Sequence, residues 1–585
     1  MAVSPATRPA PVPAGGLSEA AAARAEFARG NHPAALQLAC AALRRDPACA
    51  DAFVILGELA LAKPQGESVA DNLFRQALAL RPTDATVQRL LAKALLLQGK
   101  LNEAAPLVSR AIQAQPRDPA TLLLAARLHL ATGRLDEAEK ILRSAVHFHP
   151  QWREAAGILG DVVKRRGALA EALVWHRRAA GARGPVEPVD FGTGKARVAF
   201  LVQYPQGWTS LKSVWAAFRA DHDCAVTVIA CPFKHPDPNS EAIYGFLEKE
   251  GVPFVRWTDF KWEAGFADVL FVQLPYDDTR PAPLRILELL KLVPRLAYVP
   301  YALEIGGGAE NINLLTNQPL HRMAWAIFAR SSRHKTAFAR SCIAGDGHVA
   351  ITGHPKMDAL RQLAEAGDDG LVRFAQGRKL VAWNPHFDVR PDGSEWGTGY
   401  STFLRWQKFI VAEFARRPDL ALAIRPHPLF FDTLKQRRVM TDEEITDFTA
   451  RCAAAGNIHL DRRPSYLPIF AASAAMLSDA SSFVLEYAAT GKPLLYLHNP
   501  LGPGLNSDGD FVRTHAATAE TEAGIARFLD GVAAGDDPTR AARTEAFRRE
   551  CMHLPAEGAG ETIRQVTLAR LKQESPVPGS IAAAG

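Results

Sequence analysis

Residues 474–499, AAMLSDASSFVLEYAATGKPLLYLHN, carry the pattern of a complete β-α-β unit. The local signals predict a short apolar strand at 475–477, a turn at Ser478 and Asp479, and a helix of about three turns that ends at Gly491. A second strand follows at 494–497. We therefore expect an α/β domain with a parallel sheet around this unit.

The turn of this unit carries candidate anion-binding groups. Asp479, Ser481 and Ser482 lie where the free N–H groups and the positive end of the helix dipole point outward, so we predict that they bind a phosphate. Glu486 lies four residues after Ser482 on the same helix face, and we assign it to the ribose of a bound nucleotide. Ordinary capping of a helix by Asp and Ser produces the same pattern without a ligand.

Two more side chains are expected at the same edge of the sheet. The segment 422–428, LAIRPHP, predicts a strand that ends in Arg425 and His427, a cation and a titratable hydrogen-bond donor. Ligands of open α/β sheets bind at the carboxyl ends of the strands. Arg425 is therefore a candidate for binding the donor phosphate, and His427 is a candidate catalytic residue.

These motifs resemble those of a known family. IRPHP and LSDASSFVLEYAATGKPLLYL, together with ITGHPKMD at 351–358 and WNPHFD at 383–388, are similar to the CDP-glycerol glycerophosphotransferase family of teichoic-acid and capsule polymerases. The resemblance covers roughly residues 195–515. It implies two Rossmann-like domains in a GT-B arrangement, a nucleotide donor, CDP-linked, on the C-terminal domain, and catalysis without a metal or another cofactor.

The sequence departs from that family at one motif. Many of its members carry Trp-His-Gly with an essential His where this chain has LAYVPYALEIGGGAE at 296–310. Tyr298, Tyr301 and Glu304 stand there instead, as in a capsule-type branch of the family. Glu304 is a candidate catalytic base, while Tyr301 is a poor base at neutral pH and a better hydrogen-bond donor on the acceptor side.

The candidate residues suggest a mechanism of transfer. The donor pyrophosphate would rest at Ser481 and Ser482, with Arg425 and His427 offsetting its charge. His386, in the WNPHFD motif, or Glu304 would take the proton of the acceptor hydroxyl. The loop 203–211 follows the first strand of the N-terminal half, and its Gln206 is a second acceptor-side candidate. Asp358 and Asp388 are interpreted as structural or orienting residues.

The first third of the chain is a repeat. Gly99, Gly133 and Gly167 are spaced by 34 residues, and prolines at 82, 116 and 150 share that spacing. A 34-residue helix-turn-helix period is typical of tetratricopeptide repeats, and about five units are expected. Such repeats stack into a superhelix that binds peptides or proteins. His147 and His149 lack an acidic or thiol partner nearby, so no metal site is expected there.

Composition narrows the class of protein. The 585 residues include 68 Lys and Arg against 62 Asp and Glu, a balance too even to indicate nucleic-acid binding. Seven cysteines form no C-x-x-C pair, which indicates a reducing compartment. Neither a signal peptide nor an apolar stretch of membrane-spanning length is evident. We expect a cytoplasmic protein, with peripheral contact at the inner face of the membrane as an open alternative.

The expected fold class is an α-helical repeat followed by two Rossmann-like α/β domains. The repeats should end before a Pro/Gly-rich linker, and apolar runs alternate with helices after it. Helices are also expected near 518–531, 537–552 and 560–573. The expected domains are a disordered tail at 1–16, repeats at 17–182, a linker at 183–194, an N-terminal acceptor-side domain at 195–366, a C-terminal donor-side domain at 367–573 and a loose tail at 574–585.

Three functions remain open at this point. The first is transfer of glycerol phosphate or a related alditol phosphate from a CDP-linked donor to a surface polymer or its primer. The second is a nucleotide-sugar-dependent glycosyltransferase whose repeats present a protein acceptor, such as flagellin, or a polysaccharide. The third is an assembly scaffold with a degenerate transferase half. The repeats favour the second function, and the Arg-Pro-His-Pro and Ser-Asp-x-Ser-Ser motifs favour the first.

Overall fold

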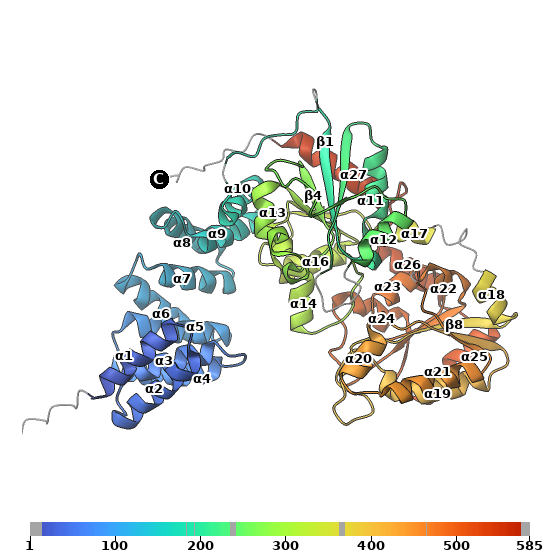
Figure 1. Cartoon of the computed structure of the whole chain (residues 1–585), viewed down its shortest axis with the longest axis horizontal. Helices are drawn as coiled ribbons and strands as arrows, with labels where there is room; N and C mark the ends of the chain where they lie inside the picture. Colours follow the sequence, from blue (N-terminus) through green and yellow to red (C-terminus); the bar gives the residue numbers. More distant parts are fainter. Residues whose placement is uncertain are drawn as a thin grey trace, which may run out of the picture. The chain divides into compact units, whose positions relative to one another are not determined.

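The computed structural model describes residues 15–182, 184–191, 194–233, 241–361, 369–463 and 465–574 (Figure 1). The chain divides into two compact units, residues 1–162 and 163–581. The tails expected at 1–16 and 574–585, and parts of the expected linker, fall largely outside the described residues. None of the described helices is both long enough and apolar enough to cross a membrane.

The first unit is built from paired helices, as the 34-residue period predicts. Consecutive helices pack as α1 on α2, α3 on α4, α5 on α6 and α7 on α8. The turns contain Gly99, Gly133 and Gly167 with φ of 74°, 73° and 91°, a left-handed conformation that favours glycine. Helix α9, which contains the boundary between the units at residues 162 and 163, and α10, in the second unit, continue the same spacing. The helices are α1 Gly15–Ala28, α2 His32–Arg45, α3 Ala50–Leu61, α4 Glu67–Leu80, α5 Ala85–Leu97, α6 Leu101–Ala114, α7 Pro119–Ala131, α8 Leu135–Phe148, α9 Arg153–Arg165 and α10 Leu169–Ala180.

The second unit begins its α/β part with a seven-stranded parallel sheet. Its strand order is β3-β2-β1-β4-β5-β6-β7. Alternate residues of β1 enter different cores, with Val198 and Phe200 on one face and Ala199 and Leu201 on the other. The strands are β1 Ala196–Val202, β2 Cys224–Ala230, β3 Val255–Arg256, β4 Val269–Val272, β5 Leu296–Tyr298, β6 Ala326–Ala329 and β7 Val349–Ile351, and the helices are α11 Lys212–Ala220, α12 Ala242–Lys249, α13 Ile286–Leu292, α14 Ala309–Thr316, α15 Pro319–Met323, α16 Ser332–Ser341 and α17 Lys356–Arg361.

A second parallel sheet has six strands in the order β10-β9-β8-β11-β12-β13. The β-α-β unit predicted at 475–497 forms its centre as β11, α23 and β12. Helix α23 has six residues, shorter than the three turns expected, because the chain leaves the helix in a turn before Gly491. The elements are β8 Lys379–Asn384, β9 Leu420–Ile424, β10 Ile458–Leu460, β11 Ala475–Ser478, β12 Leu494–Leu497 and β13 Ala517–Ala519, with α18 Asp369–Ala375, α19 Phe403–Ala415, α20 Phe430–Gln436, α21 Asp442–Ala454, α22 Leu467–Ala472, α23 Phe483–Ala488, α24 Asp510–His515, α25 Glu522–Ala534, α26 Arg540–Glu550 and α27 Ala559–Gln573.

The last helix returns to the first sheet. Ile563, Leu568 and Leu571 of α27 enter the core that surrounds β1 and α11. Asp358 fixes the start of α27, since its carboxylate accepts the N–H groups of Ala559 and Gly560 at 2.9 Å each. This agrees with the structural role expected for Asp358.

The carboxyl ends of the two sheets adjoin. The loop after β5 forms a bridge between Gly306 and Leu505, which follows β12. The Tyr400 hydroxyl donates to the Gly307 carbonyl. The fold class is therefore as expected, with a helical repeat followed by two Rossmann-like α/β domains in a GT-B arrangement.

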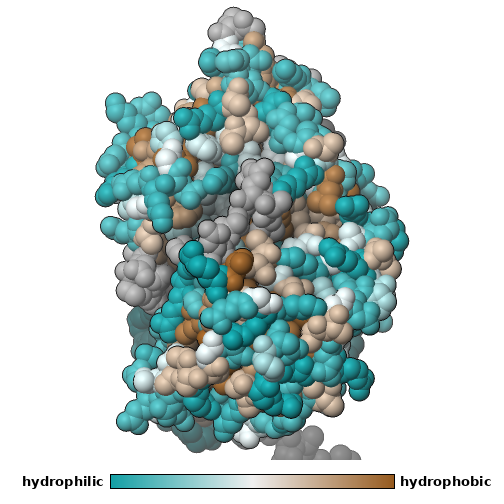
Figure 2. Space-filling model, turned by 90° about the vertical axis from the view of Figure 1, so that its right-hand side faces the viewer, coloured by the Kyte–Doolittle hydropathy of each residue, from teal (hydrophilic) through white to brown (hydrophobic). Residues whose placement is uncertain are grey.

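The surface in Figure 2 gives a view of one face of the protein. Hydrophilic residues cover most of this face, and hydrophobic residues occur in small scattered groups. Scattered apolar residues are normal for a protein surface, whereas a broad apolar patch marks an interaction site. The face shown in Figure 2 offers no such broad patch.

Candidate functional site

The carboxyl edge of the second sheet brings together the polar residues predicted from three separate motifs. Strand β8 ends at Asn384 and is followed by His386, while β9 is followed by Arg425 and His427. A backbone hydrogen bond joins the two strand ends, since the Arg425 N–H donates to the Trp383 carbonyl at 2.8 Å. The His386 and His427 rings lie 6.3 Å apart between centroids. The edge is a compact polar surface, as expected.

Both histidines are held in the same tautomer by the backbone. The His386 Nδ1 atom accepts the N–H of Asp388 at 3.0 Å, and the His427 Nδ1 atom accepts the N–H of Leu429 at 3.1 Å. A neutral imidazole whose Nδ1 accepts a hydrogen bond carries its proton on Nε2. Both rings are half-buried, and neither Nε2 atom bonds to another described residue. Each histidine therefore offers an Nε2–H donor at this edge.

Burial keeps these rings neutral. It lowers the pKa of His386 to about 4, against an opposing effect of Asp388. It lowers the pKa of His427 to about 3, and nearby His386 adds to the effect. At neutral pH both side chains are uncharged hydrogen-bond donors rather than cations or bases. In this geometry the His386 ring has no nitrogen free to accept a proton, which the predicted role of base requires.

The turn before α23 contains the two predicted serines. Ser481 donates to Asn384 Oδ1 at 2.8 Å and lies 3.2 Å from the Ser478 hydroxyl, so its oxygen belongs to a buried network. Ser482 is half-buried, and its side chain makes no capping hydrogen bond. The N–H groups of residues 480–483 have no partner among the described residues. Free donors therefore concentrate on the backbone of this turn and on Ser482.

Asp479 faces the protein rather than the outside of the turn. Its carboxylate accepts the N–H of His386 at 2.8 Å and the hydroxyls of Ser401 and Thr402. Burial raises its pKa to about 6 in spite of these hydrogen bonds. This geometry makes Asp479 an anchor for the loop that carries His386, and the structure places no free oxygen of it toward a phosphate.

Arg425 is engaged in an ion-pair cluster. Its Nη1 atom lies 2.7 Å from Asp461 Oδ2, and its Nη2 atom donates to the Arg463 carbonyl at 2.9 Å. Arg463 pairs with the same carboxylate at 2.7 Å. Two guanidinium groups therefore share the carboxylate of Asp461.

Glu486 is fully buried and paired. Its Oε1 atom lies 2.7 Å from Lys356 Nζ, and Lys356 follows β7 of the first sheet. Lys356 belongs to the Gly-His-Pro-Lys motif, whose His354 accepts the Lys356 N–H at Nδ1 and donates from Nε2 to the Pro300 carbonyl at 2.6 Å. The predicted contact of Glu486 with a ribose therefore competes with a buried ion pair.

Glu304 lies where the loops of the two sheets meet. Its carbonyl accepts from Asn506 Nδ2 at 3.1 Å, while its carboxylate has no hydrogen-bond or ion-pair partner among the described residues. Burial raises its pKa, and Lys356 and Arg330 partly oppose the shift. Glu304 acts electrostatically on Tyr400, whose ring lies 5.3 Å from that of His386. Tyr400 therefore lies next to His386 and within the electrostatic influence of Glu304.

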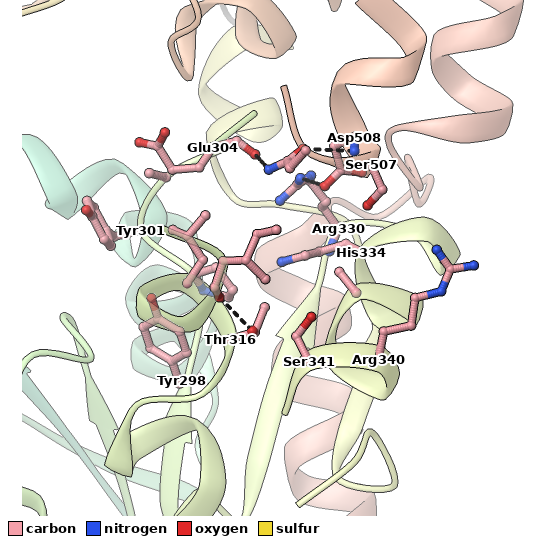
Figure 3. Close-up of a pocket in the computed structure, with 16 residues that line it drawn as sticks. Tyr298, Tyr301, Glu304, Thr316, Arg330, His334, Arg340, Ser341, Ser507 and Asp508 are labelled. Carbon is pink, nitrogen blue, oxygen red and sulfur yellow. Dashed lines mark hydrogen bonds and ion pairs between the residues drawn. The ribbon is translucent and has the colours of Figure 1, made fainter. Parts of the chain in front are cut away.

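The two acceptor-side candidates differ in their position. The Tyr301 hydroxyl lies 3.5 Å from the Tyr276 hydroxyl, and Tyr301 lines the same cavity as Glu304 (Figure 3). Gln206 is exposed in the loop after β1 and does not line that cavity. The structure therefore brings Tyr301 to the site and leaves Gln206 outside its lining.

Sequence reasoning missed two residues of this site, Tyr400 and Lys356. Tyr400 follows the NPHFD motif in a Gly-rich loop, a position at which an aromatic ring is a signal for contact with a ligand or a neighbouring loop. Lys356 was visible in the motif that carries His354. Asp388 was expected to be structural or orienting; its carboxylate pairs with Arg390 and Arg437 at 2.8 Å each, and its backbone N–H donates to His386 Nδ1.

The described residues contain no group of three or more His, Cys, Asp or Glu side chains arranged to hold a metal ion. The seven cysteines, all in described parts of the chain, form no disulfide.

Family models match the repeats. Residues 20–67, 68–119 and 95–162 match tetratricopeptide repeat models, which confirms the assignment of the first third of the chain. A search of curated proteins found no match. The resemblance of residues 195–515 to CDP-glycerol glycerophosphotransferases therefore stays a hypothesis.

Solved structures with a similar backbone fold include a transferase and epimerases. An O-GlcNAc transferase mutant of Thermobaculum terrenum is 13% identical, with 95% of this chain and 96% of that chain covered and a TM-score of 0.33. A UDP-GlcNAc 2-epimerase of Neisseria meningitidis bound to UDP-GlcNAc is 12% identical, with 64% and 100% covered and a TM-score of 0.43. The S. aureus MnaA–UDP co-structure is 12% identical, with 66% and 100% covered and a TM-score of 0.44. Likenesses of this strength carry no conclusion about activity.

Proposed function

We propose that the two-sheet part of this chain is a transferase that binds a nucleotide-sugar between its sheets and transfers the sugar to a hydroxyl of a protein or polysaccharide acceptor. The observations that carry the proposal are the pair of Nε2–H donors on His386 and His427 and the carboxylate of Glu304, which has no hydrogen-bond or ion-pair partner among the described residues. Donors on one side and a base on the other are what group transfer from a diphosphate requires.

The second sheet supplies the groups for the leaving diphosphate. The available donors are the two imidazole N–H groups, the backbone N–H groups of residues 480–483 and the Ser482 hydroxyl. None of them has an acceptor among the described residues. Fixed donors of this kind stabilise the charge that develops on the leaving group, and neutral histidines do so without changing protonation state.

Glu304 is the base in this proposal. Its carboxylate would take the proton from the acceptor hydroxyl as the hydroxyl oxygen bonds to the sugar carbon and the bond to the nucleotide diphosphate breaks. Burial raises the pKa of Glu304, which strengthens the carboxylate as a base relative to a solvated one. Tyr301 and Tyr276 lie beside it and would orient the acceptor by hydrogen bonds.

The repeats favour a macromolecular acceptor. Tetratricopeptide units form extended surfaces for peptides or proteins, and such a surface is of use to an enzyme that modifies a polypeptide. The second candidate function is transfer of an alditol phosphate from a CDP-linked donor. The Arg-Pro-His-Pro and Ser-Asp-x-Ser-Ser motifs favour it, because they are the residues on which the family resemblance rests.

A thermal-shift panel on the full chain tests this proposal. A ligand that binds the folded state alone raises the melting temperature, by an amount that grows with the ratio of its concentration to Kd. The panel consists of UDP, GDP, CMP, CDP-glycerol, CDP-ribitol, UDP-GlcNAc and CMP-linked sugars. We expect nucleotide-sugars to stabilise the protein, and the His427→Ala variant to lose most of that stabilisation.

Three outcomes separate the candidates. Stabilisation by UDP, by GDP, by UDP-GlcNAc or by the CMP-linked sugars supports the glycosyltransferase. Stabilisation by CDP-glycerol or CDP-ribitol without effect of the sugars supports the alditol-phosphate transferase. No stabilisation by any member of the panel contradicts both and favours a scaffold. The His459→Ala variant is the matched control, because this half-buried ring lies on β10, where it packs on Phe374.

A further inference from the structure

A cavity of about 210 Å³ lies beside Glu304 within the two-sheet unit (Figure 3). It is bounded by the loop after β5, by helices α14 and α16, and by residues 506–508 of the loop after β12. A water molecule occupies about 30 Å³ of liquid, so the cavity has room for roughly one sugar ring or one short alditol. None of the motifs discussed above accounts for Arg330, Arg340 and Asp508 in its wall.

Arg330 is the buried cation of this wall. It is 2% exposed, and its Nη2 atom pairs with Asp508, which is 3% exposed. The Nη1 atom of Arg330 is accessible to solvent and has no hydrogen-bond partner among the described residues. One end of the guanidinium is thus fixed by Asp508, and the other end remains available to a ligand.

His334 supplies a second donor. The residue is 7% exposed, and its Nδ1 atom faces the N–H of Arg330 at 3.5 Å. This leaves the proton on Nε2, which has no partner among the described residues. Burial, and to a lesser degree Arg330, lowers the pKa of His334 well below its ordinary value. The ring is therefore a neutral donor in the cavity wall.

Arg340 and Ser341 extend this row of donors along α16. Arg340 is exposed and has no ion-pair or hydrogen-bond partner among the described residues, and the Ser341 hydroxyl makes no hydrogen bond to them either. Figure 3 shows both residues at the end of the cavity opposite Glu304. The cavity thus has donors and positive charge toward one end and a carboxylate at the other.

Several acceptors of the wall are already used, although the buried Oδ1 atom of Asp508 has no hydrogen-bond partner among the described residues. Asn506 Oδ1 accepts the N–H groups of Asp508 and Gly509, and the Thr316 hydroxyl donates to the Ile312 carbonyl at 2.8 Å. Asp508 accepts from Arg330. A ligand of this cavity must therefore bring hydrogen-bond acceptors to Arg330, His334 and Arg340, and it meets a free carboxylate at Glu304.

We propose that this cavity binds an anionic residue of the acceptor, a sugar or alditol that bears a carboxylate or a phosphate. The anion lies toward Arg330, His334 and Arg340, and a hydroxyl of the same residue points to Glu304. This inference rests on the proposed function for the role of Glu304 as base. It adds that the acceptor end of the site selects negative charge, because the wall offers unpaired donors there.

Binding of small anionic probes to the full chain tests the inference. The probes are glucuronate and glycerol 3-phosphate, with glucose and glycerol as neutral counterparts of the same size. We expect the anionic probes to bind at least tenfold more tightly than the neutral ones in calorimetry, because hydrogen bonds to charged groups are the stronger ones. A preference between the two probes distinguishes a carboxylate from a phosphate ligand, and either preference supports the proposal.

Two variants locate the binding. Arg340→Gln removes the exposed guanidinium and should weaken the anionic probes about tenfold, while Ala337→Phe should fill the cavity and abolish binding of every probe. Lys335→Gln is the matched control, since it removes one charge from α16 without lining the cavity. Circular dichroism and the melting temperature confirm that each variant is folded.

Several results would overturn the inference. These are equal affinity for anionic and neutral probes, anionic binding unchanged in Arg340→Gln and Ala337→Phe, or displacement of the probes by peptides alone. The nucleotide panel is measured separately. Anionic binding without nucleotide binding rejects the proposed transferase and keeps the cavity site, whereas nucleotide binding without anionic binding rejects the cavity site alone.

Discussion

Lys356 and Glu486 form a buried ion pair between the two sheets, with 2.7 Å between Nζ and Oε1. Lys356 begins α17 after the last strand of the first sheet, and Glu486 lies in α23 of the second sheet. The side chains are 7% and 0% exposed, so neither charge has water as an alternative partner. The pair therefore fixes the junction next to Glu304.

We predict that the Lys356→Met variant loses about 3–5 kcal/mol of unfolding free energy, because it leaves an uncompensated buried carboxylate. The double variant Lys356→Met/Glu486→Met should recover most of that loss. Chemical denaturation followed by tryptophan fluorescence gives both values. Lys335→Met is the control for loss of a lysine, since its partner Asp346 is 4.0 Å away and the pair is partly exposed. Equal losses in the single and double variants would contradict a specific pair.

The Glu304→Gln variant tests the assignment of the base. It should lower kcat by about 10²–10⁴-fold while nucleotide affinity and melting temperature stay near wild type. Glu310→Gln, an exposed substitution at the start of α14, is the matched control. A variant that retains wild-type kcat would remove Glu304 from the mechanism.

The pH profile gives an independent check of Glu304. Burial raises its pKa above the ordinary 4.5, so its base form is lost at a higher pH than in a solvated glutamate. Activity should therefore fall as the pH decreases through this raised pKa, and the limb should vanish from the residual activity of Glu304→Gln. An acid limb that persists in the variant would assign the titration to another group.

The tautomers of the histidines are directly measurable. Nδ1 of His386 and of His427 accepts a backbone N–H, so both rings should show a protonated Nε2 and an unprotonated Nδ1 in nitrogen-15 correlation spectra at pH 7. With pKa values of about 4 and 3, neither ring should titrate between pH 8 and 5. Titration in that range would show that these rings reach solvent more freely than the structure indicates.

Because several histidines are buried and neutral, we also predict that the folded protein loses stability in acid. His321 and His354 have pKa values of about 3, well below the 6.5 expected in the unfolded chain. As the pH falls below about 6.5, the unfolded chain binds protons that the folded chain cannot, so stability decreases by up to about 1.4 kcal/mol per pH unit for each such histidine.

Two carboxyls act in the opposite direction. The pKa of Asp479 is about 6 and that of Glu304 is raised, so the folded chain binds these protons before the unfolded chain does, and their contribution grows as the pH falls. The histidines are more numerous, and the net prediction is a lower melting temperature at pH 5 than at pH 7. Differential scanning calorimetry checks it, and a melting temperature that rises toward pH 5 would contradict it.

The sequence predicted the strands of the β-α-β unit well. The strand expected at 494–497 is observed with the same bounds as β12, and the strand expected at 475–477 is observed as β11 at 475–478, because buried parallel strands read as continuous apolar runs. β13, at 517–519, was missed, since it has three residues and two of them are exposed. A helix was expected to cover this strand, and the observed α25 begins after it.

The site was predictable as a set of motifs but not as a set of contacts. The edge that holds His386, Arg425, His427 and Ser482 follows from strand ends in a parallel sheet. Whether each charged group is paired or free depends instead on residues that are distant in the sequence. Asp461 binds Arg425 from 36 residues away, and Lys356 binds Glu486 from 130 residues away, so neither pairing has a local signal.

The most direct test of the central claim is calorimetric titration of nucleoside diphosphates into the wild type, His386→Ala, His427→Ala and the control His459→Ala. We predict that a diphosphate binds the wild type and the control with equal affinity, and that each site variant weakens it about tenfold or more through loss of an N–H donor. The corresponding nucleoside, which lacks phosphates, should be insensitive to these substitutions. Equal diphosphate affinity in all four proteins would contradict the account, because the histidine pair would then have no part in binding the donor.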